Sequence, residues 1–215
     1  MNTLPITDLE TLAAELVRRL TVEVEASGRH VHLSPSDAQI LFGPGYSLTP
    51  VKELSQPGQF ACAQRVTLEG PRGSIPNVVV LGPEREESQV EISLTDGVTL
   101  GVTPPVRLSG DIGDTPGILL RCGDRVLPLR RGLIAAKRHI HLNPEAAARF
   151  GVEQGQQVRL RCLTSRPLVF EGVEVRISPH FSPAAHIDYD EANACGFRKG
   201  DRALILSGEG GCGHG

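Results

Sequence analysis

Aromatic residues are scarce in this sequence, and several patterns that would mark common classes of protein are missing. Only 4% of the residues are aromatic and none is tryptophan, so we expect no stacking surface for single-stranded nucleic acid. The net charge is −3 and there is no run of basic residues, which removes the electrostatic footprint of a nucleic-acid-binding protein. No stretch of about 18 apolar residues occurs, so the sequence predicts no membrane-spanning helix.

We also expect neither a secretory signal nor a disulfide framework. The start of the chain is polar, without the apolar run of a signal peptide. An odd, scattered set of cysteines without a Cys-x-x-Cys pair indicates reduced thiols in a cytosolic protein: Cys62, Cys122, Cys162, Cys195 and Cys212. A catalytic cysteine is the alternative, but Cys122 and Cys162 lie in runs typical of core strands. Residues 208–215 form a glycine-rich tail with Cys212 and His214, where we expect disorder and only incidental metal binding.

One seven-residue motif is present twice. Arg-His-Val-His-Leu-Ser-Pro occupies residues 29–35 and Arg-His-Ile-His-Leu-Asn-Pro occupies residues 138–144. Alternate side chains of a strand point to the same face, so each His-x-His presents two imidazoles side by side. Such a pair is a common way of binding a borderline metal such as zinc. The alternative is that the histidines are exposed at strand ends and have no function. Because the pair recurs within the same seven-residue motif, we favour an internal duplication in which each half offers part of a metal site.

The similarity of the two copies continues beyond the histidines. Ser34-Pro35 and Asn143-Pro144 each provide a helix N-cap followed by proline at the first helical position. Both predicted helices end at Phe-Gly, and glycine suits the backbone conformation that follows a helix. A chain of 215 residues can bury one large core or two small ones. The duplication favours two domains.

The rest of the chain is rich in short strands that are punctuated by glycine and proline. The predicted turns are Gly70-Pro71-Arg72-Gly73, Gly82-Pro83, Asp96-Gly97 and Gly123-Asp124. We expect one longer amphipathic helix at about residues 8–20, docked on the body of the protein or on a second subunit, with a targeting role as the alternative. The predicted strands cover residues 21–25, 65–68, 77–81, 89–94, 117–122, 133–140, 157–162, 168–177, 186–188 and 203–206. Many short strands with few helices indicate small β-barrels or sandwiches, with a boundary near residues 127–131.

Two histidine pairs need further ligands. Glu91 lies in an alternating strand, where it is either a ligand or an ordinary solvent-facing carboxylate. His186 has apolar neighbours and is either a ligand or a core histidine, and His180 is a weaker candidate. Arg85 follows Leu81-Gly82-Pro83 at a strand end, where a guanidinium can bind phosphate through two hydrogen bonds; a surface arginine is the alternative.

At this level of detail the chain resembles the phosphate propanoyltransferases of the PduL type, the zinc-dependent phosphotransacylases of bacterial microcompartments. The resemblance covers about residues 20–207. It rests on these segments: 27–33, 41–46, 54–60, 81–83, 89–93, 105–107, 109–111, 138–141, 186–188 and 190–193.

The resemblance implies a mainly β fold with two small β-barrel domains related by a pseudo-two-fold. The expected division is an N-terminal helix in residues 1–20, a first barrel in 21–127, a second barrel in 128–207 and the tail. It also implies two zinc ions per chain between the barrels. The first zinc is expected on His30, His32 and Glu91, and the second on His139, His141 and His186.

The activity implied is the interconversion of acyl-CoA plus phosphate with acyl phosphate plus CoA, where the acyl group is propionyl or acetyl. Arg85 matches the phosphate-binding, catalytic arginine of the family. The coenzyme A contacts implied are Ala26, Ser27, Gly28, Arg72, Val79 and Asn193. The expected setting is propanediol degradation in the bacterial cytoplasm or the microcompartment lumen, by a homodimer, with shell or cargo proteins as further partners.

Two other functions would use the same residues. A zinc hydrolase would activate water at these ligands, and only the phosphate and coenzyme positions separate it from a phosphotransacylase. A non-enzymatic module with structural zinc is the other alternative. Structural sites, however, are usually closed sets of four ligands rich in cysteine, whereas each set here has three protein ligands and no cysteine.

Overall fold

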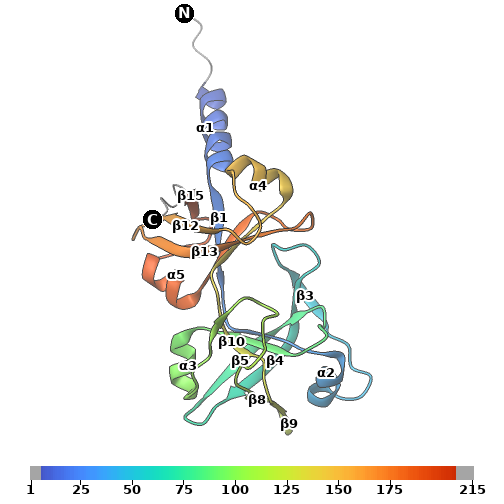
Figure 1. The fold of residues 1–215 in the computed structure, drawn as a ribbon. Helices are drawn as coiled ribbons and strands as arrows, with labels where there is room; N and C mark the ends of the chain where they lie inside the picture. Colours follow the sequence, from blue (N-terminus) through green and yellow to red (C-terminus); the bar gives the residue numbers. More distant parts are fainter. Residues whose placement is uncertain (1–5, 207–215) are drawn as a thin grey trace, which may run out of the picture. The chain divides into compact units, whose positions relative to one another are not determined.

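The computed structural model describes residues 6–206. Its strands form two sheets (Figure 1). The first is a closed six-stranded barrel in the order β1-β14-β11-β13-β12-β15, made of β1 (Val22–Ser27), β11 (His139–Leu142), β12 (Gln157–Leu163), β13 (Val169–Ile177), β14 (Ala184–Asp188) and β15 (Arg202–Leu206).

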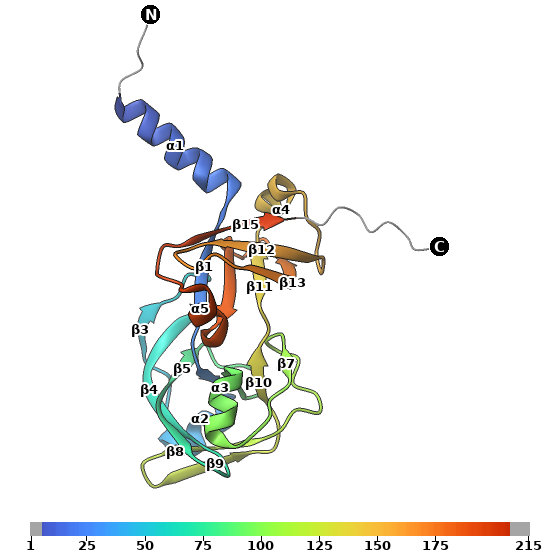
Figure 2. The ribbon, with the colours of Figure 1, turned by 90° about the vertical axis from the view of Figure 1, so that its left-hand side faces the viewer.

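The second sheet has nine strands and is curled but open (Figure 2). Its main path is β7-β10-β6-β2-β5-β4-β8-β9, and β3 pairs with β4. The strands are β2 (His30–His32), β3 (Pro50–Glu53), β4 (Phe60–Glu69), β5 (Ser74–Gly82), β6 (Gln89–Ile92), β7 (Val106–Arg107), β8 (Ile118–Cys122), β9 (Arg125–Leu129) and β10 (Leu133–Ala136). The predicted mainly β fold is therefore confirmed. Of the two predicted β-barrels, one is closed and the other is a curled, open sheet.

Five helices accompany the sheets in the described part of the chain: α1 (Ile6–Leu20), α2 (Pro35–Phe42), α3 (Leu94–Leu100), α4 (Pro144–Phe150) and α5 (Tyr189–Cys195). The two helices that follow the repeated motif form as predicted. Ser34 caps α2 by accepting a hydrogen bond from the Asp37 amide, and Asn143 caps α4 in the same way from Ala146. The glycine after α4, Gly151, has φ of 64°, a left-handed conformation that favours glycine.

The chain folds into two compact units whose sequence ranges interleave. Among the described residues one unit comprises 6–25, 139–186 and 192–206, and the other comprises 26–138 and 187–191. The ranges expected from the duplication, 21–127 and 128–207, do not coincide with these units. The reason is that β1 pairs with β15 in the barrel, whereas β10 pairs with β6 and β7 in the curled sheet. The predicted tail, 208–215, lies outside the described residues.

Two local predictions were wrong. Residues 133–140 do not form one strand, because β10 belongs to the curled sheet and β11 to the barrel. Asp96-Gly97 is not a turn between strands but lies inside α3, which starts with a capping box between Ser93 and Asp96. Helix α5 was not predicted either. Both unpredicted helices are only seven residues long, too short for the apolar periodicity of a helix to be visible.

Helix α1 forms as expected but leaves its apolar stripe uncovered. Leu9, Leu12 and Leu16 are between 50% and 60% exposed, so docking of this face on the body of the chain was a wrong expectation. Docking on a second subunit stays a prediction. None of the helices in residues 6–206 is long and apolar enough to cross a membrane.

Packing in the barrel follows the period-two pattern of the strands. Along β12 burial alternates, with Val158, Leu160 and Cys162 buried and Leu163 44% exposed. Leu160 pairs with Phe170 of β13 and Ile205 of β15 and is completely buried, so its side chain fills the barrel core.

We therefore expect Leu160→Ala to lower the free energy of unfolding by about 2–5 kcal/mol, because it leaves a cavity in a core that cannot fully collapse. Leu163→Ala on the same strand is the control and should change it by less than about 0.5 kcal/mol. Urea denaturation followed by circular dichroism measures both. Equal losses for the two variants would contradict the assignment of the core face.

Candidate metal centres and the adjoining pocket

The first group of candidate ligands is built around strand β2. This strand lies between β5, to which it is parallel, and β6, to which it is antiparallel. The register places Glu91 of β6 directly opposite His30, and the His30 Nε2 and Glu91 Oε1 atoms are 3.5 Å apart. His32 lies on the same face, two residues further along. One ligand atom from each of the three residues lies within 4.8 Å of the others, and all three side chains are buried.

The second group repeats this construction around β11. This strand lies between a parallel neighbour, β13, and an antiparallel neighbour, β14. The register places His186 opposite His139, just as Glu91 stands opposite His30. The ring centroids of His139, His141 and His186 are 4.6 to 5.0 Å apart, and a set of their ligand atoms lies within 4.8 Å. The structure thus brings together both sets of residues that the sequence singled out.

Several ligand nitrogens are buried without a hydrogen bond. Nδ1 of His32 and both ring nitrogens of His141 have no hydrogen-bond partner among the described residues. A buried polar atom that lacks a partner costs about 1–3 kcal/mol, and native proteins rarely tolerate it without a reason. A metal ion coordinated by these nitrogens supplies the missing interaction, so the residues present fit such a group.

The protonation states of His32 and His141 suit metal binding as well. Burial lowers the pKa of His32 to about 2 and, with the neighbouring His139, that of His141 to about 3. These imidazoles are therefore neutral near pH 7, which is the form that coordinates metals. Burial alone would raise the pKa of Glu91, but His30 and the Ser109 hydrogen bond keep it well below its usual value. Conversely, the Glu91 carboxylate raises the pKa of His30 against the effect of burial.

The backbone fixes the orientation of His30. Its Nδ1 donates to the Gly28 carbonyl over 2.8 Å, which leaves Nε2 as the ligand atom on the side of Glu91. Gly28 itself is closely packed, since a Cβ on this residue would lie 2.6 Å from the Tyr189 hydroxyl oxygen. A larger residue at position 28 would therefore require the ring of Tyr189, which is 44% exposed, to move aside.

A hydrogen-bonded chain joins Glu91 to Arg85. Nη1 of Arg85 donates to Ser109 Oγ over 2.7 Å, and Nε2 of Gln89 donates both to this oxygen over 2.9 Å and to Glu91 Oε1 over 2.6 Å. Gln89 Oε1 in turn accepts from the Gly110 amide. The sequence analysis did not single out Gln89 or Ser109. The available signal was that Gln89 stands two residues before Glu91 and therefore on the same face of its strand.

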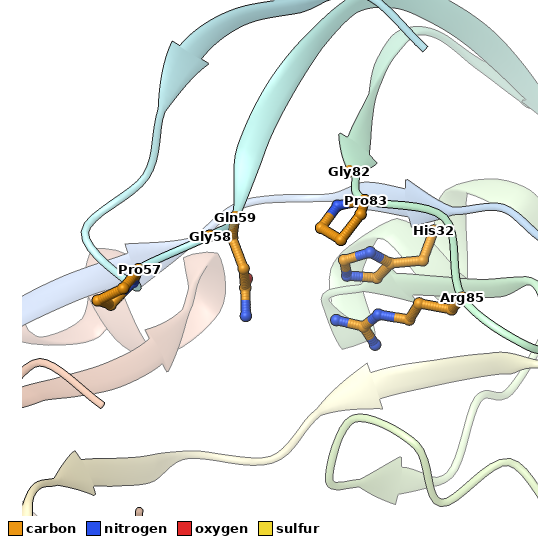
Figure 3. A pocket seen from close by; sticks show the side chains of 7 residues that line it. All are labelled: His32, Pro57, Gly58, Gln59, Gly82, Pro83 and Arg85. Carbon is orange, nitrogen blue, oxygen red and sulfur yellow. The ribbon is translucent and has the colours of Figure 1, made fainter. Parts of the chain in front are cut away.

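Arg85 and His32 line one cavity of about 250 Å³, with Pro57, Gly58, Gln59, Gly82 and Pro83 as the other lining residues. Figure 3 shows the Gln59 side chain and the Arg85 guanidinium directed into the same space beside the His32 ring. The backbone amide of Arg85 donates to the Leu33 carbonyl over 2.9 Å. This hydrogen bond fixes Arg85 beside the end of β2, the strand that carries His30 and His32. A positively charged group, an amide and a candidate metal ligand therefore face one small space.

The two groups differ in their surroundings. In the first copy Gly82-Pro83-Glu84 leads to Arg85, whereas in the second Ser178-Pro179-His180 leads to Phe181, which stacks on His141 with ring centroids 4.0 Å apart. The barrel group has its own carboxylate, because Glu25 Oε2 lies 3.6 Å from Nδ1 of His186. His180 is exposed and belongs to neither group.

The residues matched to coenzyme A contacts are more scattered. Val79 pairs with His30 in the β2–β5 register, and Ala26, Ser27 and Gly28 form the segment that enters β2. Arg72 is exposed at the β4–β5 turn, and its amide donates to the Leu100 carbonyl. Arg72 stands seven positions before Val79, which amounts to about 20 Å of extended chain. Asn193 is exposed on α5.

Comparison with known proteins agrees with the site. Residues 23–198 match the family model for phosphate propanoyltransferase. Phosphate propanoyltransferases from Enterococcus faecalis and Listeria monocytogenes are 54% and 53% identical to the chain, and each alignment covers 92% of this chain and at least 95% of the relative. The protein of that name from Thermotoga maritima is 50% identical over 85% of this chain and 88% of its own length.

These findings define the protein as an acyltransferase. More narrowly, the chain belongs to the phosphate propanoyltransferase family.

Two of the described cysteines, Cys62 and Cys195, lie in surroundings that oppose activation of the thiol. Cys62, Cys162 and Cys195 are completely buried, and burial raises the pKa of Cys62 and of Cys195. Because the thiolate is the nucleophile, a raised pKa works against catalysis. Cys122 is half-buried, and Cys212 lies outside the described residues.

We expect single replacement of each of the five cysteines by alanine to leave more than about a tenth of the activity, since losing a true nucleophile removes several powers of ten. Acyl-phosphate formation and thermal unfolding should be measured for each variant. Lower activity together with lower thermal stability indicates lost packing. A stable variant that retains its metal but has no turnover, with an acyl-thioester trapped on the unaltered chain, would contradict this expectation.

Proposed function

We propose that the chain interconverts acyl-CoA plus phosphate with acyl phosphate plus CoA, with propionyl-CoA or acetyl-CoA as substrate. The observation that carries the proposal is the cavity in which Arg85 and His32 face the same space. An arginine beside a metal ligand fits an anion such as phosphate. The family supplies the acyl-transfer reaction, and this cavity supplies a place for its phosphate.

We propose that the metal is zinc and that each chain binds two ions, one on His30, His32 and Glu91 and one on His139, His141 and His186. Zinc takes imidazole and carboxylate ligands, and sites with three protein ligands keep an open position for substrate. When bound, zinc provides a Lewis acid for oxygen atoms and a soft partner for a thiolate.

The protein residues hold the reactants in place. Arg85 binds phosphate oxygens through its planar guanidinium, and Ser109, held by Gln89, fixes the guanidinium. Gln59 donates from the other side of the cavity. Orientation of this kind can contribute about 7–11 kcal/mol when the reacting atoms are well aligned. The proposed coenzyme contacts are Ala26, Ser27, Gly28, Arg72, Val79 and Asn193.

The proposed chemistry is direct attack without an acyl-enzyme. A phosphate oxygen forms a bond to the thioester carbonyl carbon, the carbon–sulfur bond breaks, and coenzyme A leaves as the thiolate. The reverse reaction starts from acyl phosphate. Cys62 and Cys195 are deeply buried and their pKa values are raised, which makes them poor nucleophiles. This supports attack by phosphate itself rather than by a cysteine.

The setting of the reaction belongs to the proposal as well. The relatives come from bacteria, which supports the bacterial cytoplasm, or the lumen of a microcompartment engaged in propanediol degradation, as the location. A homodimer and contacts with shell or cargo proteins are proposed on the same basis. The exposed apolar stripe of α1 is compatible with a second subunit.

Metal analysis tests the ligand sets. Protein purified without chelators should contain about two zinc ions per chain, and His186→Ala should lose only one, because its partners are His139 and His141. His180→Ala is the control, since this histidine is exposed, and should keep both ions. Inductively coupled plasma mass spectrometry gives the stoichiometry. Loss of both ions in His186→Ala would indicate one shared site, and full activity with almost no metal would refute the proposal.

Steady-state kinetics test Arg85. Arg85→Ala should raise the KM for phosphate or lower kcat by about 10²–10³ while the zinc content stays the same, because a preorganised donor to developing charge is lost. Lysine should restore only part of the activity, since it lacks the planar fork. Arg131→Ala removes an exposed arginine that pairs with Glu87 and should behave like the unaltered protein. Phosphate-independent cleavage of acyl-CoA at the full rate would instead favour a zinc hydrolase.

A further inference from the structure

The arginine that precedes each His-x-His pair is bound to an acidic residue at the start of a helix. In the curled sheet Arg29 Nη2 lies 2.8 Å from Asp96 Oδ1, and its Nε donates to Oδ2 over 3.0 Å. The Asp96 side chain is only 7% exposed. In the other copy of the motif, Arg138 Nη1 donates to Glu191 Oε1 over 2.7 Å, and the Glu191 side chain is 16% exposed. The same pairing therefore occurs twice.

Each of these acids also closes the first turn of its helix. Asp96 accepts from the Ser93 amide, and Ser93 Oγ accepts from the Asp96 amide. Glu191 accepts from the Asp188 amide over 3.0 Å, and Asp188 accepts from the Glu191 amide over 2.8 Å. These are reciprocal capping boxes. Each begins two residues after a candidate ligand, Glu91 in one case and His186 in the other.

A second internal repeat follows from this comparison. Residues 91–96 read Glu-Ile-Ser-Leu-Thr-Asp and residues 186–191 read His-Ile-Asp-Tyr-Asp-Glu. Both have the order ligand, isoleucine, cap, two variable residues and acid. The duplication therefore includes the third ligand and the acid that receives the arginine.

We propose that Arg29 and Arg138 are positioning residues, each of which holds the third ligand of its triad against the first. Arg29 is adjacent to His30, and His30 pairs with Glu91 across the β2–β6 register. A clamp from Arg29 to Asp96 therefore ties the end of β2 to the helix that follows β6. Arg138 does the same for β11 and β14 through Glu191. This inference rests on the proposed metal-dependent function.

The clamps act on the geometry of the triads as well as on stability. Arg29 and Arg138 are 39% and 36% exposed, but Asp96 and Glu191 are only 7% and 16% exposed, so removing either arginine leaves a largely buried carboxylate without its cation and also destabilises the fold. A metal triad needs, in addition, ligands that are held closely in place. Substitution of an outer group that orients a metal ligand typically lowers metal affinity 10- to 100-fold.

The test uses zinc titration of the metal-free protein against a chromophoric chelator, in backgrounds that retain one site. His186→Ala leaves the His30 triad, and His30→Ala leaves the His139 triad. Arg29→Met should weaken zinc binding about 10- to 100-fold in the His186→Ala background and leave it unchanged in the other. Arg138→Met should show the opposite pattern. Arg121→Met is the matched control, because Arg121 forms a similar two-bond pair with Glu69, 41% and 30% exposed, and should change neither site.

Variants of the acid separate the clamp from the cap. Asp96→Asn keeps an oxygen for the Ser93 amide but loses the charge, so it should weaken the His30 triad as Arg29→Met does. Asp96→Glu copies the acid of the second repeat and should retain most of the affinity. These substitutions keep the test open if Arg29→Met does not fold.

The outcomes distinguish this inference from the function on which it rests. Equal weakening of both sites by Arg29→Met, or unchanged affinities in all clamp variants, overturns the positioning role alone. Absence of zinc binding by the unaltered protein overturns the metal-dependent function and the positioning role together. The expected site-specific losses support both.

Discussion

Each group of candidate ligands depends on one strand pairing. Because side chains in a strand alternate, His-x-His fixes two ligands on one face, but the third must come from a neighbouring strand whose register is correct. Antiparallel pairing sets Glu91 opposite His30 and His186 opposite His139. A slip of one residue would turn the third ligand to the other face and replace it with Val90, Ile92, Ala185 or Ile187, none of which binds a metal.

The histidine pairs could be predicted from the sequence because the period of a strand is local information. The first turns of α2 and α4 could be predicted for the same reason, since cap and proline are adjacent. The third ligands could not be derived from spacing alone: Glu91 had an equally simple interpretation as a surface carboxylate, and only the resemblance to a known family raised it. The register that makes it a neighbour of His30 is long-range information.

The features that the sequence analysis missed or predicted wrongly have a similar cause. Residues 133–136 are apolar and lead directly into the His-x-His motif, which favours one strand, and no local signal indicates that β10 and β11 enter different sheets. The short helices α3 and α5 follow strands directly, and their capping residues were the only local evidence for them. Gln89 and Ser109 have no chemistry that identifies them in isolation, and their role depends on the atoms between Arg85 and Glu91.

Duplication has given this chain two triads of the same construction but different character. The triad on β2 has a carboxylate ligand and adjoins an arginine-lined cavity, whereas the triad on β11 has three imidazoles, with Phe181 against one of them and Glu25 near another. In the curled sheet the residue that β10 places beside Glu91 is Ile134, whereas in the barrel the third ligand, His186, has the Glu25 carboxylate beside it.

The exchange of strands between the halves also affects how the chain can fold. Val22 of β1 pairs with Ala203 of β15, and the Arg202 side chain donates to Thr21 across 181 residues of sequence. Contacts between such distant segments are slow to form, because a long loop must close before they stabilise anything. All strands of the curled sheet lie within residues 30–136, so this sheet can form while the chain is still being synthesised. The barrel cannot close until its last strand has left the ribosome, so the triad on β11 is the later of the two to be completed.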